Sequence, residues 1–201
     1  MWMDWKGLFK KAEGILEKEP RLIQLPSQGK VVFVGDTHGD LEASQQVIQR
    51  YLKKPYYIVF LGDYVDRGNY SKENIQYLIG LKLEYPGEIF LLTGNHEGFM
   101  VKEVYPANFW ASISLEEKEA YGLLFSKFPF ATTAQNGILA LHGALPDLET
   151  LEDMNRIELG DEHWDRIVWG DFMEGVIDSP GDLWGRPQFG SKYFNRLMER
   201  Y

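Results

Sequence analysis

Three glycine-framed motifs, each placed directly after an apolar run, constrain this chain more than any other feature of its sequence. They are GDTHGD at 35–40, GDYVDRG at 62–68 and GNHEG at 94–98. We interpret each apolar run as a strand and each motif as the loop at its carboxyl end. Open α/β sheets bind their ligands at that edge. We therefore expect six motif side chains to gather there: Asp36, His38, Asp63, Asp66, Asn95 and His96.

The donor groups of these motifs indicate which ligands the site takes. Carboxylate, amide and imidazole groups suit Mn²⁺, Fe or Zn²⁺, whereas softer metals would call for thiolates, and the chain has no cysteine. Glycines next to the functional residues let the backbone turn sharply and let a phosphate approach closely. Divalent metal and phosphate are the expected ligands.

The first half of the chain alternates strand and helix patterns. Strands are expected at 30–34, 56–61 and 89–93, with one helix capped by Asp40 and the next by Ser71. This βαβαβ order predicts a parallel sheet flanked by helices.

The second half predicts antiparallel strands. A capping box at 114–117 opens a helix to about residue 127, and an Asn-Gly turn joins strands 131–134 and 138–142 into a hairpin. A strand at Ile167 to Trp169 and a closing helix at 192–201 follow. The predicted fold class is α/β, an α+β sandwich of mixed sheets flanked by helices.

Composition and charge limit the partners and the location. A chain of 201 residues that is 44% hydrophobic suits one globular domain, and its net charge of −9 argues against a nucleic acid or an anionic membrane as main partner. No signal peptide pattern and no apolar run of roughly 18 residues is present. We expect a cytoplasmic protein.

Residues 1–29 are expected to form an N-terminal helix and a connector. Apolar residues recur at roughly helical spacing as far as Glu19, with Trp2 and Trp5 near the start. This helix either docks on the domain or binds a partner or a membrane surface.

A fourth motif, LHGALPD, follows at 141–147. Together the four motifs resemble those of PPP-type phosphoprotein phosphatases, within the calcineurin-like metallophosphoesterase superfamily. The resemblance runs from about Lys30 to Asp171, and four motifs in the right order are far more specific than one. It implies a catalytic domain over 30–201 that hydrolyses phosphoserine and phosphothreonine in proteins.

The resemblance also implies the metal ligands. Asp36 and His38 would hold one ion, Asn95 and His142 the other, and Asp63 would bridge the two. A pair of divalent ions, manganese first and iron or zinc otherwise, would provide a bound hydroxide as the nucleophile.

The remaining site residues follow in the same way. His96 would be the general acid, Asp66 would hold its tautomer, and Arg67, Asn95 and Arg186 would bind phosphate. Arg186 precedes Phe189-Gly190 at a compressed spacing, and pairing with Asp182 or Glu199 is the competing interpretation. Two further residues are expected to take no part in catalysis. Glu97 would brace its loop, and His163 would lie on a solvated turn or helix face.

The family pattern continues beyond the closing helix with a strand that ends in a histidine, whereas this sequence ends at Tyr201. We expect missing C-terminal strands, a weakly bound second metal, reduced activity and an open sheet edge that could allow self-association.

Two other functions remain open at this stage. One is a dinucleoside polyphosphate hydrolase of the diadenosine tetraphosphatase type, which would depend less on His96. The other is a catalytically impaired scaffold that binds phosphoproteins.

Overall fold

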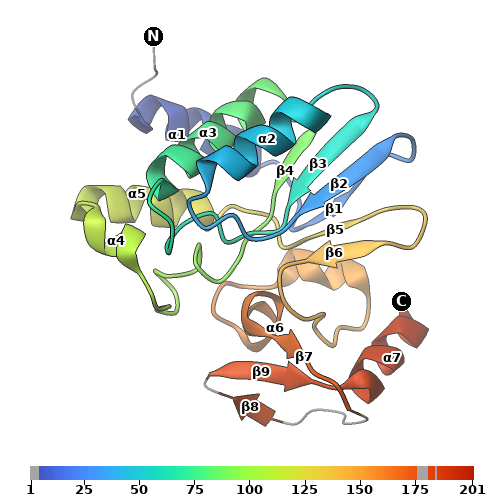
Figure 1. Ribbon diagram of the computed structural model, residues 1–201. Coiled ribbons are helices and arrows are strands. Elements are labelled where there is room, and N and C mark those ends of the chain that lie inside the picture. The colour runs from blue at the N-terminus through green and yellow to red at the C-terminus, as the bar shows by residue number, and fades with distance from the viewer. Residues whose placement is uncertain (1–4, 176–180, 184) are drawn as a thin grey trace.

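The first half of the chain forms the expected βαβαβ unit. A computed structural model describes residues 5–175, 181–183 and 185–201. Strands β2, β3 and β4 pair in parallel in that order, which confirms the predicted sheet (Figure 1). The elements of this half are α1 (Trp5–Leu16), β1 (Leu22–Gln24), β2 (Lys30–Val34), α2 (Leu41–Tyr51), β3 (Tyr56–Phe60), α3 (Ser71–Glu84) and β4 (Ile89–Leu91).

The second half contributes strands to two further three-stranded sheets. Strands β5 and β6 form the predicted antiparallel hairpin, and β1 pairs in parallel with β5 to complete the order β1-β5-β6. The third sheet has the order β7-β9-β8. The elements are α4 (Asn108–Ser112), α5 (Leu115–Phe125), β5 (Ala131–Thr133), β6 (Leu139–Leu141), η1 (Leu151–Arg156), α6 (Glu162–Trp169), β7 (Asp171–Phe172), β8 (Gly181–Leu183), β9 (Arg186–Phe189) and α7 (Ser191–Arg200).

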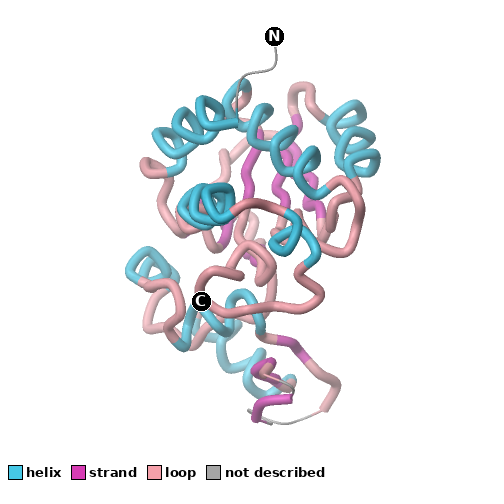
Figure 2. The backbone as a smooth tube through the Cα atoms, turned by 90° about the vertical axis from the view of Figure 1, so that its left-hand side faces the viewer, coloured by secondary structure: helices cyan, strands magenta, loops and turns pink. Residues whose placement is uncertain are grey.

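Alternation along the strands divides the core into layers. Ile58 and Phe60 of β3 face the core beneath α1, α2 and α3, whereas Val59 faces Ile23 and Leu25 between the β2-β3-β4 sheet and the β1-β5-β6 sheet. A third core packs α6 and α7 beneath β5 and β6. Helices therefore cover both outer faces of a two-sheet sandwich, as Figure 2 shows for the helices above the parallel strands.

Helix α1 docks on this sandwich. Its residues Phe9, Ala12 and Leu16 are buried in the core shared with α3 and α5. Trp2 lies outside the described residues. Among the described helices, none is long and apolar enough to cross a membrane.

Two predicted caps are confirmed. The Asp40 side chain accepts from the Ala43 N–H at the start of α2. Ser114 and Glu117 form both bonds of the capping box of α5. Short local sequence patterns therefore predicted the first residues of α2 and α5 correctly.

Two other local predictions are wrong. Ser71 is not a cap, since α3 begins at Ser71 and follows Tyr70, which makes no side-chain capping bond. The strand expected at Ile167 to Trp169 is the end of α6, which begins after Asp161. The buried side chains of this segment recur at helical spacing, at Trp164, Ile167 and Val168. This spacing favours a helix more strongly than the two β-branched residues favour a strand.

Candidate metal centre

The loops after β2, β3 and β4 meet at Asp63. The backbone N–H groups of Thr37 and His38 donate to the Asp63 carbonyl at 3.1 and 2.9 Å. The backbone N–H of His96 donates to Asp63 Oδ1 at 3.0 Å. One aspartate thus ties all three motif loops together, and its side chain is almost fully buried.

Backbone strain is concentrated in the same loops. A positive φ in a residue other than glycine is uncommon and costs about 1–3 kcal/mol. Among the described residues, four show it: His38 (41°), Asp63 (58°), Asp66 (67°) and Arg67 (64°). The fold holds strained residues at the place where the motifs meet, which is typical of functional sites.

Two glycines allow the close approach of these loops. Gly62 has φ of +112°, and a Cβ there would lie 2.4 Å from the Gly94 nitrogen. A Cβ on Gly94 would lie 2.3 Å from Asp63 Oδ1. Gly62 and Gly94 are therefore required by the close packing of these two loops.

His38 presents one ring nitrogen to two carboxylates. Its Nδ1 lies 2.8 Å from the Val65 carbonyl, which can only accept, so we assign the proton to Nδ1. Its Nε2 then carries a lone pair and lies 3.4 Å from Asp63 Oδ2 and 3.7 Å from Asp36 Oδ2.

His142 repeats this arrangement on the other side of Asp63. Its Nδ1 faces the Leu61 carbonyl at 3.1 Å, and its Nε2 lies 3.2 Å from Asn95 Oδ1 and 3.7 Å from Asp63 Oδ1. His142 follows β6 directly, so the hairpin brings it to the edge formed by the first three motifs.

These donor atoms fit divalent cations. The Nε2 atoms of two histidines face carboxylate and amide oxygens, and a cation between these atoms would bind to all of them. Histidines that donate the other N–H to a carbonyl are typical metal ligands. Two groups within the described residues bring their ligand atoms within 4.8 Å of one another: His38, Asp63 and His96, and Asp36, Asp63 and His142. Asp63 belongs to both, as a bridging ligand would.

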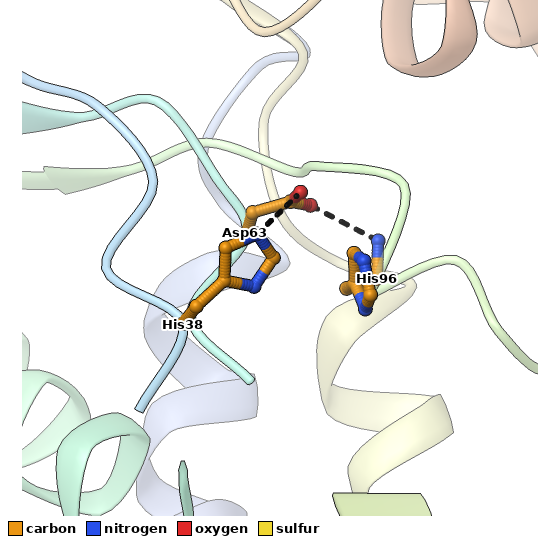
Figure 3. A group of neighbouring side chains, drawn as sticks. All are labelled: His38, Asp63 and His96. Atoms are coloured by element: carbon orange, nitrogen blue, oxygen red, sulfur yellow. Dashed lines mark hydrogen bonds and ion pairs between the residues drawn. The ribbon is translucent and has the colours of Figure 1, made fainter. Parts of the chain in front are cut away.

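The second member of the site is a buried His–Asp pair. His96 Nδ1 lies 2.7 Å from Asp66 Oδ2, and both side chains are fully buried. The other oxygen of Asp66 accepts from the Phe109 N–H at 2.8 Å. His96 Nε2 has no hydrogen-bond partner among the described residues and lies near His38 and Asp63 (Figure 3). The pair holds one ring orientation and leaves Nε2 available to a ligand.

Glu97 braces the loops, as its position predicts. Its carboxylate accepts from the backbone N–H groups of Asp63, Tyr64 and Gly94 at 2.7, 2.9 and 3.0 Å. Burial, with the nearby Asp63 charge, raises the pKa of Glu97 to about 8, and the three donors oppose this. Glu97 contacts no ring nitrogen, so its role is to shape the Asp63 loop.

Sequence reasoning missed the contribution of α4. Asn108 Oδ1 accepts from the Arg67 N–H at 2.7 Å, and Trp110 Nε1 donates to the His96 carbonyl at 3.0 Å. Together with the Phe109 bond to Asp66, three consecutive residues support the His–Asp pair and Arg67. The aromatic, irregular stretch before residue 112 was the only signal, and it carries no motif.

The two arginines expected to bind phosphate are placed differently. Arg67 is exposed beside the site, and among the described residues its guanidinium has no hydrogen bond or ion pair. The Arg186 guanidinium lies over the Trp169 ring, 5.3 Å from its centroid, and 3.4 Å from Asp171. The described contacts do not bring Arg186 to the metal centre. The side chain of Asp182, one expected partner, lies outside the described residues.

His163 lies in α6, half-buried, and the metal groups of the described residues do not include it.

The model of one protein family matches most of the chain. The calcineurin-like phosphoesterase model matches residues 29–200. A probable serine/threonine-protein phosphatase of Encephalitozoon cuniculi is 26% identical over 210 residues, which cover 97% of this chain and 45% of that protein. The chain thus spans less than half the length of this curated relative.

Solved structures agree on the fold. A serine/threonine phosphatase from Saccharomyces cerevisiae, described as similar to human phosphatase PP5, matches with a TM-score of 0.82 and 23% identity over 98% of this chain and 69% of that one. A cold-active protein-tyrosine phosphatase of Shewanella matches with a TM-score of 0.51 and 18% identity over 71% of this chain and 48% of that one. At these identities the likeness shows the fold alone.

Proposed function

The chain belongs to the calcineurin-like phosphoesterase family, and we propose that it hydrolyses phosphoserine and phosphothreonine monoesters in proteins. The observation that carries the proposal is the buried Asp66–His96 pair, whose histidine reaches into one of two groups of candidate ligand atoms that share Asp63. A proton donor next to a cation site is what hydrolysis of a phosphate ester with a poor leaving group requires.

The ligand sets expected from the motifs are retained in the proposal. Asp36 and His38 would hold one divalent ion, with Asn95 and His142 holding the other and Asp63 shared. Bound there, the ions would lower the pKa of a water and stabilise charge on the phosphoryl oxygens. Manganese is the first choice, with iron and zinc as alternatives.

Arg67 is the proposed phosphate anchor. Its planar guanidinium can donate two parallel hydrogen bonds to a pair of phosphoryl oxygens. The bond from its backbone to Asn108 holds the left-handed turn that directs the arginine out of the loop. Asn95 supplies an amide at the same edge. Arg186 keeps a phosphate role only if it leaves Asp171.

His96 is the proposed general acid. In its protonated form, Nε2 would give its proton to the seryl or threonyl oxygen as the bond from phosphorus to that oxygen breaks. A water attacks phosphorus from the opposite side, so the products are the free hydroxyl side chain and inorganic phosphate. Asp66 keeps Nδ1 protonated throughout and directs Nε2 toward the leaving oxygen.

The experiment measures phosphate release from a phosphoserine peptide by the chain with Mn²⁺. Asp63→Asn serves as the blank and Asp153→Asn, in η1 and outside the motifs, as the matched control. We expect turnover that requires Mn²⁺, survives Asp153→Asn and disappears in Asp63→Asn.

A parallel assay with diadenosine tetraphosphate separates the alternatives. Turnover of the dinucleotide without turnover of the peptide would replace our proposal with the polyphosphate hydrolase. Mn²⁺ binding without turnover of either substrate would favour a phosphoprotein-binding scaffold.

A further inference from the structure

The loop that follows His142 is irregular, yet most of it is buried. Within the described residues, neither a helix nor a strand covers 142–150. Ala144, Leu145 and Leu148 nevertheless lie in the core that they share with α6 and α7. Because buried backbone N–H and C=O groups need hydrogen-bond partners, the position of this loop depends on the partners that its neighbours supply.

The C-terminal end of α6 supplies the first partners. The N–H groups of Gly143 and Ala144 donate to the carbonyls of Ile167 and Arg166 at 2.7 and 3.0 Å. A Cβ on Gly143 would lie 2.7 Å from the Ile167 oxygen, so the approach is close. The last carbonyls of a helix have no partner within the helix, and here the loop after His142 provides it.

One face of α7, with the residue that ends it, supplies the remaining partners. Tyr193 Oη donates to the Leu145 carbonyl at 2.9 Å, and the Leu148 N–H donates to Tyr201 Oη, also at 2.9 Å. Arg200 donates to the Leu148 carbonyl. Positions 193, 196 and 200 are three or four residues apart and therefore share one face of the helix. This face of α7 holds the loop over 145–148.

Asp147 is the charged centre of this contact. One of its carboxylate oxygens accepts from Arg196 at 2.6 Å, and the other accepts from Arg200. Burial alone would raise the pKa of Asp147, but the hydrogen bonds from the two arginines outweigh burial and lower that pKa. The carboxylate is therefore charged at neutral pH and joins two successive turns of α7 to the loop.

We propose that Asp147 is a positioning residue for the metal centre: it fastens α7 to the loop after His142 and so keeps His142 where an ion would bind. The inference rests on the proposed function, because that function assigns His142 to a metal. Asp147 lies five positions after His142. The bonds at Gly143, Ala144 and Leu145 tie the residues between them to α6 and α7.

The two proposed ions should differ in their dependence on this contact. His38 belongs to the loop after β2, where its ring is held by the Val65 carbonyl and its N–H by the Asp63 carbonyl. Release of α7 should therefore weaken the ion of Asn95 and His142 and spare the ion that His38 binds. A change that only loosened the fold would weaken both ions alike.

The first test follows each ion at its own histidine. Zn²⁺ is diamagnetic, so NMR can follow the ring signals of His38 and His142 while the metal-free chain is titrated. In Asp147→Asn, the Zn²⁺ concentration that half-saturates His142 should rise at least about fivefold, with that for His38 nearly unchanged. Asp147→Glu keeps the charge and should largely restore the wild-type value. Glu17→Gln, at an ion pair outside the motifs, is the matched control and should change neither.

Amide hydrogen exchange in the metal-free chain tests the contact without any ion. The amides of Gly143 and Ala144 should exchange faster in Asp147→Asn than in the wild type, whereas the His38 amide, bonded to Asp63, should not. A wild-type chain that binds no Zn²⁺ would overturn the proposed function and the role toward metal. Faster exchange in Asp147→Asn would still show that Asp147 holds the loop, so the two failures are distinguishable.

A second variant keeps the test decisive should Asp147→Asn fail to fold. Tyr193→Phe removes one hydroxyl group and keeps the ring that stacks on Phe189, and it should also raise the half-saturating Zn²⁺ concentration for His142 alone. Equal weakening at His38 and His142 in either variant would overturn the proposal. Unchanged Zn²⁺ binding and unchanged exchange in Asp147→Asn would overturn it as well.

Discussion

At the scale of single residues, backbone carbonyls decide what the histidines can do. The backbone carbonyls of Val65 and Leu61 accept hydrogen bonds from Nδ1 of His38 and His142, respectively. The Nε2 atoms of both rings therefore face the shared Asp63. His96 differs, because its Nδ1 proton goes to a carboxylate, Asp66. A carbonyl partner orients a ring whose other nitrogen can bind metal, while the carboxylate partner holds the ring orientation expected of a proton donor.

The role of His96 predicts an effect that depends on the leaving group. His96→Asn should lower kcat for a phosphoserine peptide by about 10²–10⁴, the usual contribution of a general acid. The loss should be much smaller for p-nitrophenyl phosphate, whose leaving group needs no proton. His163→Asn, outside the motifs, is the control and should leave both rates unchanged. Equal losses on the two substrates would argue that His96 binds metal instead.

Glycine-to-alanine substitutions at Gly94 and at Gly80 should have opposite effects on stability, because only Gly94 is in tight contact with Asp63. Gly94→Ala should destabilise the chain by about 1–3 kcal/mol and abolish activity, since the Cβ would collide with Asp63. Gly80→Ala in α3, where a Cβ meets nothing within 4 Å, should stabilise it by about 0.5–1 kcal/mol. Urea unfolding of both variants checks this, and a stable, active Gly94→Ala chain would contradict the packing argument.

At the scale of elements, a buried ion pair connects Glu19, three residues after the end of α1, to Lys82 of α3. Lys82 is 1% exposed and its Nζ contacts the Glu19 carboxylate as well as the carbonyls of Pro86 and Ile89, at 3.0 and 2.8 Å. Burial raises the pKa of Glu19 and lowers that of Lys82, so each charge depends on the other. The connector is held by this pair where it leaves α1.

Removing one partner should therefore cost more than removing both. Lys82→Met should destabilise the chain by about 3–5 kcal/mol because it leaves a carboxylate buried without a cation. Adding Glu19→Gln should restore part of that loss. A double-mutant cycle by urea denaturation measures the coupling, with Lys127→Met, at a more exposed ion pair with Glu17, as the control. Additive effects of the two changes would show that the pair is not coupled.

At the scale of the whole molecule, the sequence predicted the contacts that local patterns specify and missed those between distant residues. Motif glycines and apolar runs predicted the parallel sheet and the meeting of Asp36, Asp63 and Asn95, and the Asn-Gly turn predicted the hairpin, because those signals are local. The place of His142 beside them was implied only by the family resemblance. The support given by Asn108 to Arg67 was missed, since it joins residues 41 positions apart without a motif. The Arg186 partner was missed for the same reason. The boundary between residues 1–29 and the domain stays a prediction, although α1 shares the main core.

Calorimetric titration of the metal-free chain with Mn²⁺ tests most directly whether the four motifs build one metal centre around Asp63. We predict saturable binding that is lost in Asp63→Asn, reduced in both His38→Ala and His142→Ala, and unchanged in the control His163→Ala. Binding should raise the midpoint of thermal unfolding by mass action in the wild-type chain. Unaltered Mn²⁺ binding by Asp63→Asn, or equal losses in His163→Ala and His142→Ala, would contradict this account.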